Sequence, residues 1–220
     1  MIFKLDISAM IKVFYYRCLV ITLGLLCTIT SANADTRVLI LGDSLSASYS
    51  MQQNEGWVAL LQNTFNNRKQ NITLINASIS GETTAGGLAR LDKLLDKQNP
   101  DVVLIELGGN DGLRGFPVKK AKQNLLQMIE KVRAKQKIPL LMQIRIPPNY
   151  GPRYTKMFEG MYPKIAAQQK VTLVPFFMEE IGINPDLMLP DGIHPNKKAM
   201  PQITKFMDKA LIKALDEAVK

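Results

Sequence analysis

The sequence contains one histidine, His194 in the stretch DGIHP, and an early serine, Ser44 in the stretch GDSLSAS. Serine becomes an effective nucleophile when a neighbouring base takes its proton, and histidine is suited to that task near neutral pH. Asp191 precedes the histidine by three residues, so its carboxylate can accept from Nδ1 and leave Nε2 facing the serine. These three residue types could therefore perform acyl transfer.

Two further segments carry groups that could stabilise an oxyanion. Gly81, in NASISGET, allows its own N–H to approach a ligand, and Asn110, in LGGNDG, offers an amide donor. With Ser44 N–H they would supply the two or three donors that an oxyanion hole needs. Each piece alone also fits ordinary turn and cap chemistry, and a lone histidine also fits a solvated loop. Three neighbouring serines compete for the nucleophile role: Ser46, Ser48 and Ser50.

Short apolar runs alternate with longer segments of helical periodicity along the chain. Each run is apolar without alternation, which is typical of parallel strands that helices cover on both faces. This order predicts an α/β fold with an open parallel sheet, in which ligands bind beyond the carboxyl ends of the strands. Five such runs are present, at residues 37–42, 71–76, 101–107, 138–144 and 171–177.

Three helices bear on this prediction. Residues 118–137 place Ala121, Leu125, Met128, Ile129 and Val132 on one apolar stripe opposite a lysine-rich face. The last helix is expected from about Asn196 to Ala218, with Pro201 tolerated only in its first turn. A further helix is expected to begin close to Ser44 and to aim its N–H groups at an anion there.

Residues 1–34 have the pattern of a cleavable secretory signal peptide. Basic residues precede an uncharged apolar run at residues 18–30, and Ala32-Asn33-Ala34 offers a small-x-small cleavage site. The run is too short to span a bilayer. Cleavage after Ala34 would leave a single domain, residues 35–220, in the periplasm or outside the cell. Met10 is an alternative start to Met1, because it also precedes a compact basic region.

The charge and composition of the chain exclude several classes of function. The formal net charge is +9, and residues 1–34 contribute three basic and one acidic residue, so the processed chain keeps +7. Its lysines are spread over helical faces without interleaved aromatic residues, which argues against a nucleic-acid partner but allows weak attraction to anionic membranes. Cys18 and Cys27 both precede the cleavage site, so no thiol remains, and no nucleotide-binding motif is present.

The order Ser, Gly, Asn, His resembles the GDSL, or SGNH, hydrolase family. Residues 42–45 match its nucleophile block, Gly81 the second block, residues 108–111 the third, and Asp191 with His194 the last. The resemblance implies a three-layer α/β/α sandwich of flavodoxin type and neither a metal nor an organic cofactor. The roles it implies are a nucleophile, Ser44; a base, His194; an orienting carboxylate, Asp191; and oxyanion donors at Ser44, Gly81 and Asn110.

The resemblance also implies a substrate class. Esters and thioesters would be cleaved through an acyl-enzyme, the substrates being lysophospholipids, acyl thioesters and small aryl esters, with Leu113 and Phe116 of the loop at residues 112–117 near the acyl chain. Alternatives are a carbohydrate acetylesterase or another esterase of narrow specificity on the same scaffold, and a binding protein whose site has decayed. A monomer without stable membrane insertion is expected. One departure from the family pattern is Ser48, where a glycine is expected.

Overall fold

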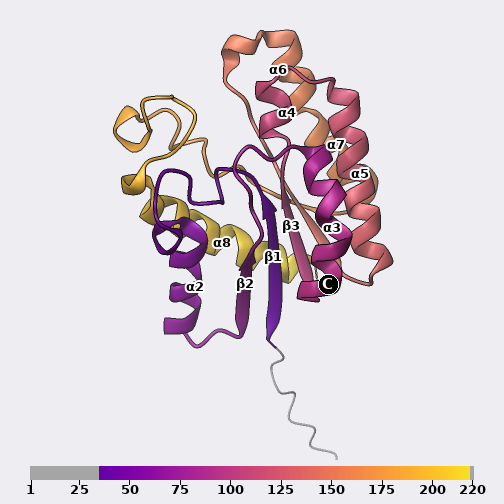
Figure 1. Cartoon of the computed structure of the whole chain (residues 1–220), viewed down its shortest axis with the longest axis vertical. Helices are drawn as coiled ribbons and strands as arrows, with labels where there is room; N and C mark the ends of the chain where they lie inside the picture. Colours follow the sequence, from indigo (N-terminus) through magenta and orange to yellow (C-terminus); the bar gives the residue numbers. More distant parts are fainter. Residues whose placement is uncertain (1–34, 219–220) are drawn as a thin grey trace, which may run out of the picture. The chain divides into compact units, whose positions relative to one another are not determined.

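Five parallel strands form one sheet in the computed structural model, which describes residues 35–218 (Figure 1). The strand order is β2-β1-β3-β4-β5, and every neighbouring pair is parallel. The predicted α/β fold with a five-stranded parallel sheet is confirmed. The predicted signal peptide, residues 1–34, lies outside the described residues. The strands are β1 (Thr36–Gly42), β2 (Ile72–Asn76), β3 (Val102–Glu106), β4 (Ile138–Met142) and β5 (Thr172–Val174).

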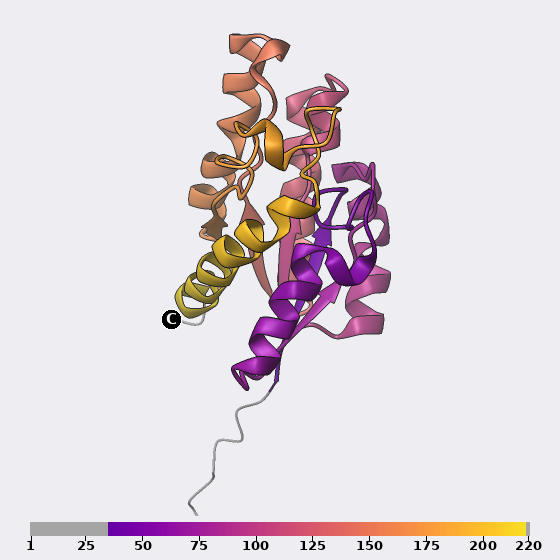
Figure 2. The same cartoon turned by 90° about the vertical axis from the view of Figure 1, so that its left-hand side faces the viewer.

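Helices cover both faces of the sheet. On one face α2 (Trp57–Asn67) packs against α8 (Met200–Ala218), and Figure 2 shows these two helices toward the viewer. On the other face α5 (Val118–Ala134) packs against α3 (Thr84–Gln98) and α7 (Met161–Gln169). The five predicted stripe residues of α5 are all buried. Shorter elements lie between the strands and these helices: α4 (Gly109–Leu113), α6 (Pro152–Glu159), η1 (Gln53–Glu55), η2 (Pro148–Tyr150), η3 (Pro185–Leu187) and η4 (Lys197–Ala199).

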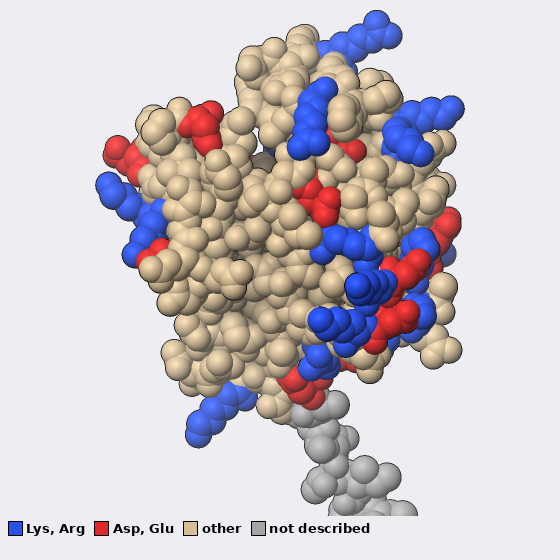
Figure 3. Space-filling view, viewed as in Figure 1, with Lys and Arg blue, Asp and Glu red and all other residues tan. Residues whose placement is uncertain are grey.

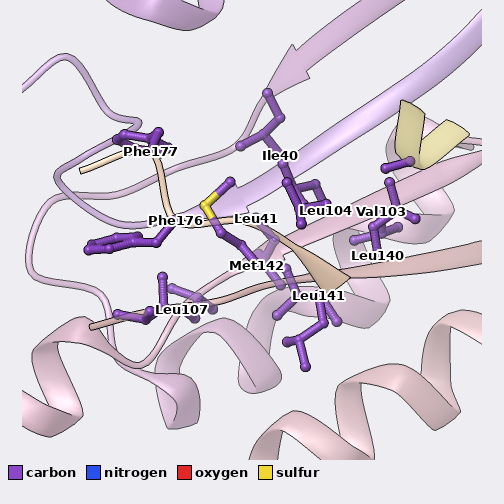
Figure 4. Close-up of a cluster of buried hydrophobic side chains, with 14 of the residues drawn as sticks. Ile40, Leu41, Val103, Leu104, Leu107, Leu140, Leu141, Met142, Phe176 and Phe177 are labelled. Atoms are coloured by element: carbon purple, nitrogen blue, oxygen red, sulfur yellow. The ribbon is translucent and has the colours of Figure 1, made fainter. Parts of the chain in front are cut away.

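The three central strands form the core. Every residue of β3 is buried, including Glu106, and the last five residues of β1 are buried as well. Figure 4 shows Leu41, Leu104 and Leu141 of three adjacent strands within one apolar cluster. Burial on both faces explains why the sequences of the three central strands are continuous apolar runs.

The strand order creates a crevice at the end of β1. The chain passes from β1 to β2 on one side and then crosses to β3 on the other, so the connections after β1 and β3 leave in opposite directions. In open parallel sheets this switch point is where ligands bind. Ser44 lies just after β1, and Asn110 lies in α4, the first helix after β3, so the fold brings both to this crevice.

Two local expectations differ from the structure. The helix expected to begin close to Ser44 is absent: residues 44–50 form consecutive turns, and α2 begins only at Trp57. The reason is that Ser48 and Ser50 have φ angles of 59° and 60°, which a right-handed helix does not contain. The fifth strand ends at Val174, because Pro175 follows and cannot donate to the ladder.

Candidate active site

Ser44, His194 and Asp191 form a continuous hydrogen-bonded relay. The Nε2 atom of His194 lies 2.9 Å from Ser44 Oγ, and its Nδ1 atom lies 2.7 Å from Asp191 Oδ2. The serine and the histidine are half-buried, whereas Asp191 is exposed. With Nδ1–H donating to the carboxylate, the unprotonated Nε2 faces the hydroxyl, which is the arrangement that general-base catalysis requires.

The loop that carries the acid and the base is a short hairpin beyond β5. Met188 and Pro195 form an isolated antiparallel bridge, and Leu189 N–H donates to the His194 carbonyl at 2.8 Å. Asn196 closes the base of the hairpin, because its Nδ2 donates to the Met188 carbonyl at 3.1 Å and to the Asp186 carbonyl. Local hydrogen bonds therefore hold the tip of this loop, while Met188 at its base packs against the core.

Asp191 accepts hydrogen bonds with both of its oxygens. Burial raises its pKa, but the backbone N–H and imidazole of His194 and the N–H of Ile193 lower it by more, so the pKa lies below its usual value. The carboxylate is therefore ionised at neutral pH and orients the imidazole. Tyr49 stacks on the imidazole, with ring centroids 4.1 Å apart and an interplanar angle of 26°. Tyr49 belongs to the turn that contains Ser44, here called the nucleophile turn, so this turn also fixes the plane of the His194 imidazole.

The nucleophile turn stands on two buried acids, Asp43 and Glu106. Asp43 N–H donates to Glu106 Oε2 at 3.3 Å, and Asp43 Oδ1 accepts from Leu45 N–H at 3.1 Å. A Cβ atom at position 42 would overlap Glu106 Oε2 and lie 2.7 Å from Ser78 Oγ, so only glycine leaves room for this carboxyl group. The turn is therefore positioned by groups that reach into the core.

Burial changes the proton affinity of both acids. Loss of hydration raises the pKa of Asp43 to about 6, although its bond from Leu45, the charge of His194 and its bond from Asn110 oppose the shift. Burial, reinforced by the charge of Asp43, raises the pKa of Glu106 well above its usual range. Glu106 is consequently the member of the pair that keeps its proton.

Two groups flank Ser44 as candidate oxyanion donors. Asn110 Nδ2 donates one hydrogen to Asp43 Oδ2 at 3.2 Å, which leaves its second amide hydrogen for a ligand. Gly81 adopts a φ of +78°, a conformation that favours glycine, and its carbonyl accepts from Arg114 at 3.1 Å. Within residues 35–218, no protein acceptor takes the Gly81 N–H.

The aspartate next to Asn110 has a different task. Asp111 is buried and accepts from Thr84 N–H at 2.8 Å and from Thr84 Oγ1 at 2.6 Å, and Asn124 Nδ2 donates to the same hydroxyl. It thereby ties α4 to the N-terminus of α3 and to α5. Its role is to hold the element that presents Asn110.

A pocket of about 260 Å³ opens beside Ser44. Its lining includes Ser44 and Asn110 and one ion pair, in which Arg145 Nε lies 2.8 Å from Glu179 Oε1. Figure 3 shows the surface notched at the top, between the lobe that carries the His194 loop and the lobe that carries α6. The apolar lining comes from both walls and includes Leu45, Leu113, Ile144, Ile146, Pro147, Phe176, Met178, Met188 and Ile193.

The structure therefore brings together most of the residues singled out in the sequence. Leu113 lines the pocket, whereas Phe116 is exposed and lies outside its lining, as does Gly81. Among residues 35–218, no three His, Cys, Asp or Glu side chains gather as a group that could hold a metal ion.

Three residues with contacts at the site were not found from the sequence: Tyr49, Asp43 and Glu106. An acid within the apolar run VVLIEL was a signal for Glu106, and Asp43 stands inside the nucleophile block itself. For Tyr49 the sequence carries no signal, because its contact with His194 depends on the tertiary fold.

A family model described as GDSL-like Lipase/Acylhydrolase matches residues 40–200, which include all of these groups. The chain belongs to this family. The matched range includes the Gly-Asp-Ser-Leu block at residues 42–45. The chain is accordingly an SGNH-type ester hydrolase, as the order of its blocks indicated.

Similar proteins cover most of the chain. An arylesterase of Vibrio mimicus is 48% identical over 86% of this chain and 94% of its own length. The thioesterase 1/protease 1/lysophospholipase L1 of Escherichia coli strain K12 is 50% identical over 84% of this chain and 88% of its own. A similar solved structure is that of EstA, a psychrotrophic esterase from a Pseudoalteromonas species, in a form inhibited by monoethylphosphonate. It superposes with a TM-score of 0.81 at 52% identity and covers 83% of this chain and all of its own.

Proposed function

We propose that the chain hydrolyses carboxylic esters and thioesters through an acyl-enzyme formed on Ser44. The observation that carries the proposal is the relay of 2.9 Å and 2.7 Å contacts through His194 to Asp191. Ser44 Oγ attacks the carbonyl carbon while its proton passes to His194 Nε2, and the imidazolium is stabilised by the ionised Asp191. The same proton then goes to the departing alcohol or thiol, and water attacks the acyl-enzyme by the reverse path.

The tetrahedral oxyanion would be held by Ser44 N–H, Gly81 N–H and Asn110 Nδ2. Support comes from the free amide hydrogen of Asn110, the unbonded N–H of Gly81 and the placement of all three where β1, β2 and β3 end. Donors that are fixed before the reaction stabilise the developing charge without reorganisation. Asp43 fixes the asparagine, so it is a positioning residue in this proposal.

The pocket supports acyl esters, thioesters and lysophospholipids as substrates. Its lining is apolar near Ser44, which suits an acyl chain, and we assign the contact with that chain to Leu113 and not to Phe116. An acetyl group, with two carbon atoms, would leave most of about 260 Å³ unfilled, which disfavours a carbohydrate acetylesterase. The names of the relatives, arylesterase and thioesterase/lysophospholipase, point the same way.

We further propose that the chain works in the periplasm or outside the cell as a single-domain monomer, after cleavage behind Ala34. The pattern of residues 1–34 supports the export route, and residues 35–218 belong to one compact unit with its own core. None of the helices within residues 35–218 has the length and apolar character needed to cross a bilayer.

Covalent labelling tests the assignment of the nucleophile. The protein is treated with an organophosphonate ester and the modified peptide is located by mass spectrometry. We expect the adduct on Ser44, and we expect Ser44→Ala to lose both labelling and ester hydrolysis, the latter by about 10⁴-fold or more. Ser50→Ala, at an exposed position of the same turn, serves as the control and keeps both.

The outcomes separate the proposal from its alternatives. An adduct on Ser46, Ser48 or Ser50 with Ser44 unmodified would overturn the assignment. A series of esters with increasing acyl length separates the substrate classes, since activity restricted to acetyl esters would indicate an acetylesterase. Equal and negligible rates for the unsubstituted chain and Ser44→Ala would indicate a decayed site.

A further inference from the structure

The exposed large apolar side chains of the described residues all follow the carboxyl ends of strands, on the side of the sheet where the site lies. Three of them, Phe116, Tyr150 and Met157, lie in or next to α4 and α6, outside the lining of the pocket but close to its mouth. We call residues 112–120 and 148–157 the α6 rim. Large apolar groups that cluster in contact with water on one face mark an interaction surface.

The α6 rim is one structural unit and is continuous with the mouth of the pocket. The hydroxyl of Tyr150 donates to the Leu113 carbonyl at 2.8 Å, and the hydroxyl of Tyr154 donates to the Phe116 carbonyl at 2.9 Å. Leu113 and Pro148 also line the pocket. A partner that covers the rim would therefore lie directly beside the entrance to Ser44.

The charge of the rim is uniformly positive. It contains five basic and no acidic residues, and within residues 35–218 none of the five forms an ion pair. Figure 3 shows Lys and Arg side chains around α6 at the top of the molecule. These residues are Arg114, Lys119, Lys120, Arg153 and Lys156, and all are exposed.

Other charged surfaces of the molecule differ from the rim. Farther along α5, Lys131 and Lys135 pair with Asp92 and Asp96 of α3 at 2.6 Å each, so their charge is locally neutralised. The opposite wall of the pocket, residues 179–191, has four acidic and no basic residues. Unpaired cations combined with exposed apolar groups therefore distinguish the α6 rim.

We propose that the α6 rim docks on the surface of an anionic phospholipid bilayer, so that the pocket opens toward the lipid. Basic residues beside exposed aromatic and apolar groups match such a surface, because the charges meet lipid phosphates while the apolar groups enter the headgroup layer. Only the consequence of docking rests on the proposed function, namely that lysophospholipids would reach Ser44 from the bilayer. Binding itself does not require catalysis.

Vesicle sedimentation tests the docking. Residues 35–220 are used, because the apolar run 18–30 would itself bind lipid. We expect sedimentation with vesicles of equimolar phosphatidylglycerol and phosphatidylcholine at low salt, loss of binding at high salt, and little binding to phosphatidylcholine alone. Arg153→Glu with Lys156→Glu should weaken the partition coefficient by at least about tenfold, and Met157→Ser by about threefold.

Matched controls locate the effect. Lys209→Glu with Lys213→Glu makes the same change in net charge on α8, and Ile183→Ser removes a side chain that is 82% exposed, against 54% for Met157, from the acidic wall. Both controls should bind within about twofold of the unsubstituted chain. Ser44→Ala should bind normally, and the α6 variants should hydrolyse a soluble short-chain ester normally, so docking and catalysis fail independently.

Three outcomes would overturn the docking proposal. The first is absence of binding to anionic vesicles at low salt, and the second is equal loss of binding in the rim variants and the α8 control. The third is self-association without lipid that the α6 variants abolish, which would assign the rim to a second copy of the chain.

Discussion

The two sides of the candidate site are positioned by different means. Ser44 stands on Gly42, Asp43 and Glu106, whose buried groups belong to the ends of two central strands. His194 lies on a hairpin whose Asp191 is exposed and which is held mainly by hydrogen bonds within the loop, with Tyr49 stacked on the imidazole. The nucleophile thus derives its position from the core, whereas the base derives its position from local turn chemistry.

This difference has an energetic meaning. A group fixed by the core moves only if the core rearranges, because protein interiors are close-packed. A group fixed by a surface hairpin can open locally at small cost. Substitutions on the two sides should therefore differ in whether they change activity alone or stability as well.

The largest expected effect is on the base side. Asp191→Asn replaces the oxygen that accepts from His194 Nδ1 or forces the wrong tautomer, so kcat should fall by about 10⁴-fold. The unfolding midpoint should hardly change, because the loop lies outside the core. Asp186→Asn, an exposed acid of the same connection, is the control and should keep full activity. A loss of less than about tenfold in Asp191→Asn would contradict the relay.

A smaller effect is expected from Asp43→Asn on the nucleophile side. One oxygen of Asp43 accepts from Leu45 N–H and the other from Asn110 Nδ2, so an amide would set a donor against a donor at one of them. Displacement of the asparagine should lower kcat by about 10²-fold with little change in KM.

Asp101→Asn is the comparison for Asp43→Asn, because Asp101 accepts from Arg37 N–H at the amino end of the sheet. It should leave kcat unchanged. If Asp43→Asn raised KM and left kcat intact, Asp43 would support the pocket and not the oxyanion donor.

The smallest effect on activity is expected from Glu106→Gln, which instead changes how stability depends on pH. The pKa values of Glu106 and Asp43 are raised in the native state, so the native state binds protons more tightly than the unfolded state. The free energy of unfolding should therefore fall as the pH rises from about 4 through about 6 and beyond.

Glutamine at position 106 has no proton to lose, so denaturant unfolding across this pH range should give a flatter curve for Glu106→Gln. Activity at neutral pH should stay within about tenfold, because Glu106 keeps its proton there and glutamine resembles the protonated acid. Parallel stability curves for the two proteins would contradict a raised pKa of Glu106 in the native state, because a group contributes to the pH dependence only if its pKa differs between the native and unfolded states.

The sheet could be predicted from the sequence because its three central strands are buried on both faces. Residues 101–107 and 37–42 are apolar without interruption, and this pattern has few explanations other than a covered parallel strand. The predicted length of the fifth strand was too great, because the apolar run continues past Pro175 whereas the strand pairing ends at Val174.

The parts of the site that could be predicted are those for which the residue types alone indicate the chemistry. One histidine, a nearby aspartate and a serine after the first strand define the relay, and the structure places them in contact. The turn after Ser44 was wrongly predicted as the start of a helix, because Ser48 has a left-handed φ of 59°, which residues other than glycine seldom adopt. The stacking of Tyr49 on His194 depends on two segments that meet only in the folded chain.

The side chain of Ser48 restricts which residues can occupy position 56. Its side chain occupies the space next to Gly56, where a Cβ atom would overlap Ser48 Oγ and lie 3.0 Å from Ser48 Cβ. The backbone of Gly56 has a φ of −72°, which any residue adopts, so only this neighbour excludes a side chain there. Glycine at position 48 would remove both contacts, so a side chain at position 56 is better tolerated after that change than before it, and the order of the two changes matters during divergence.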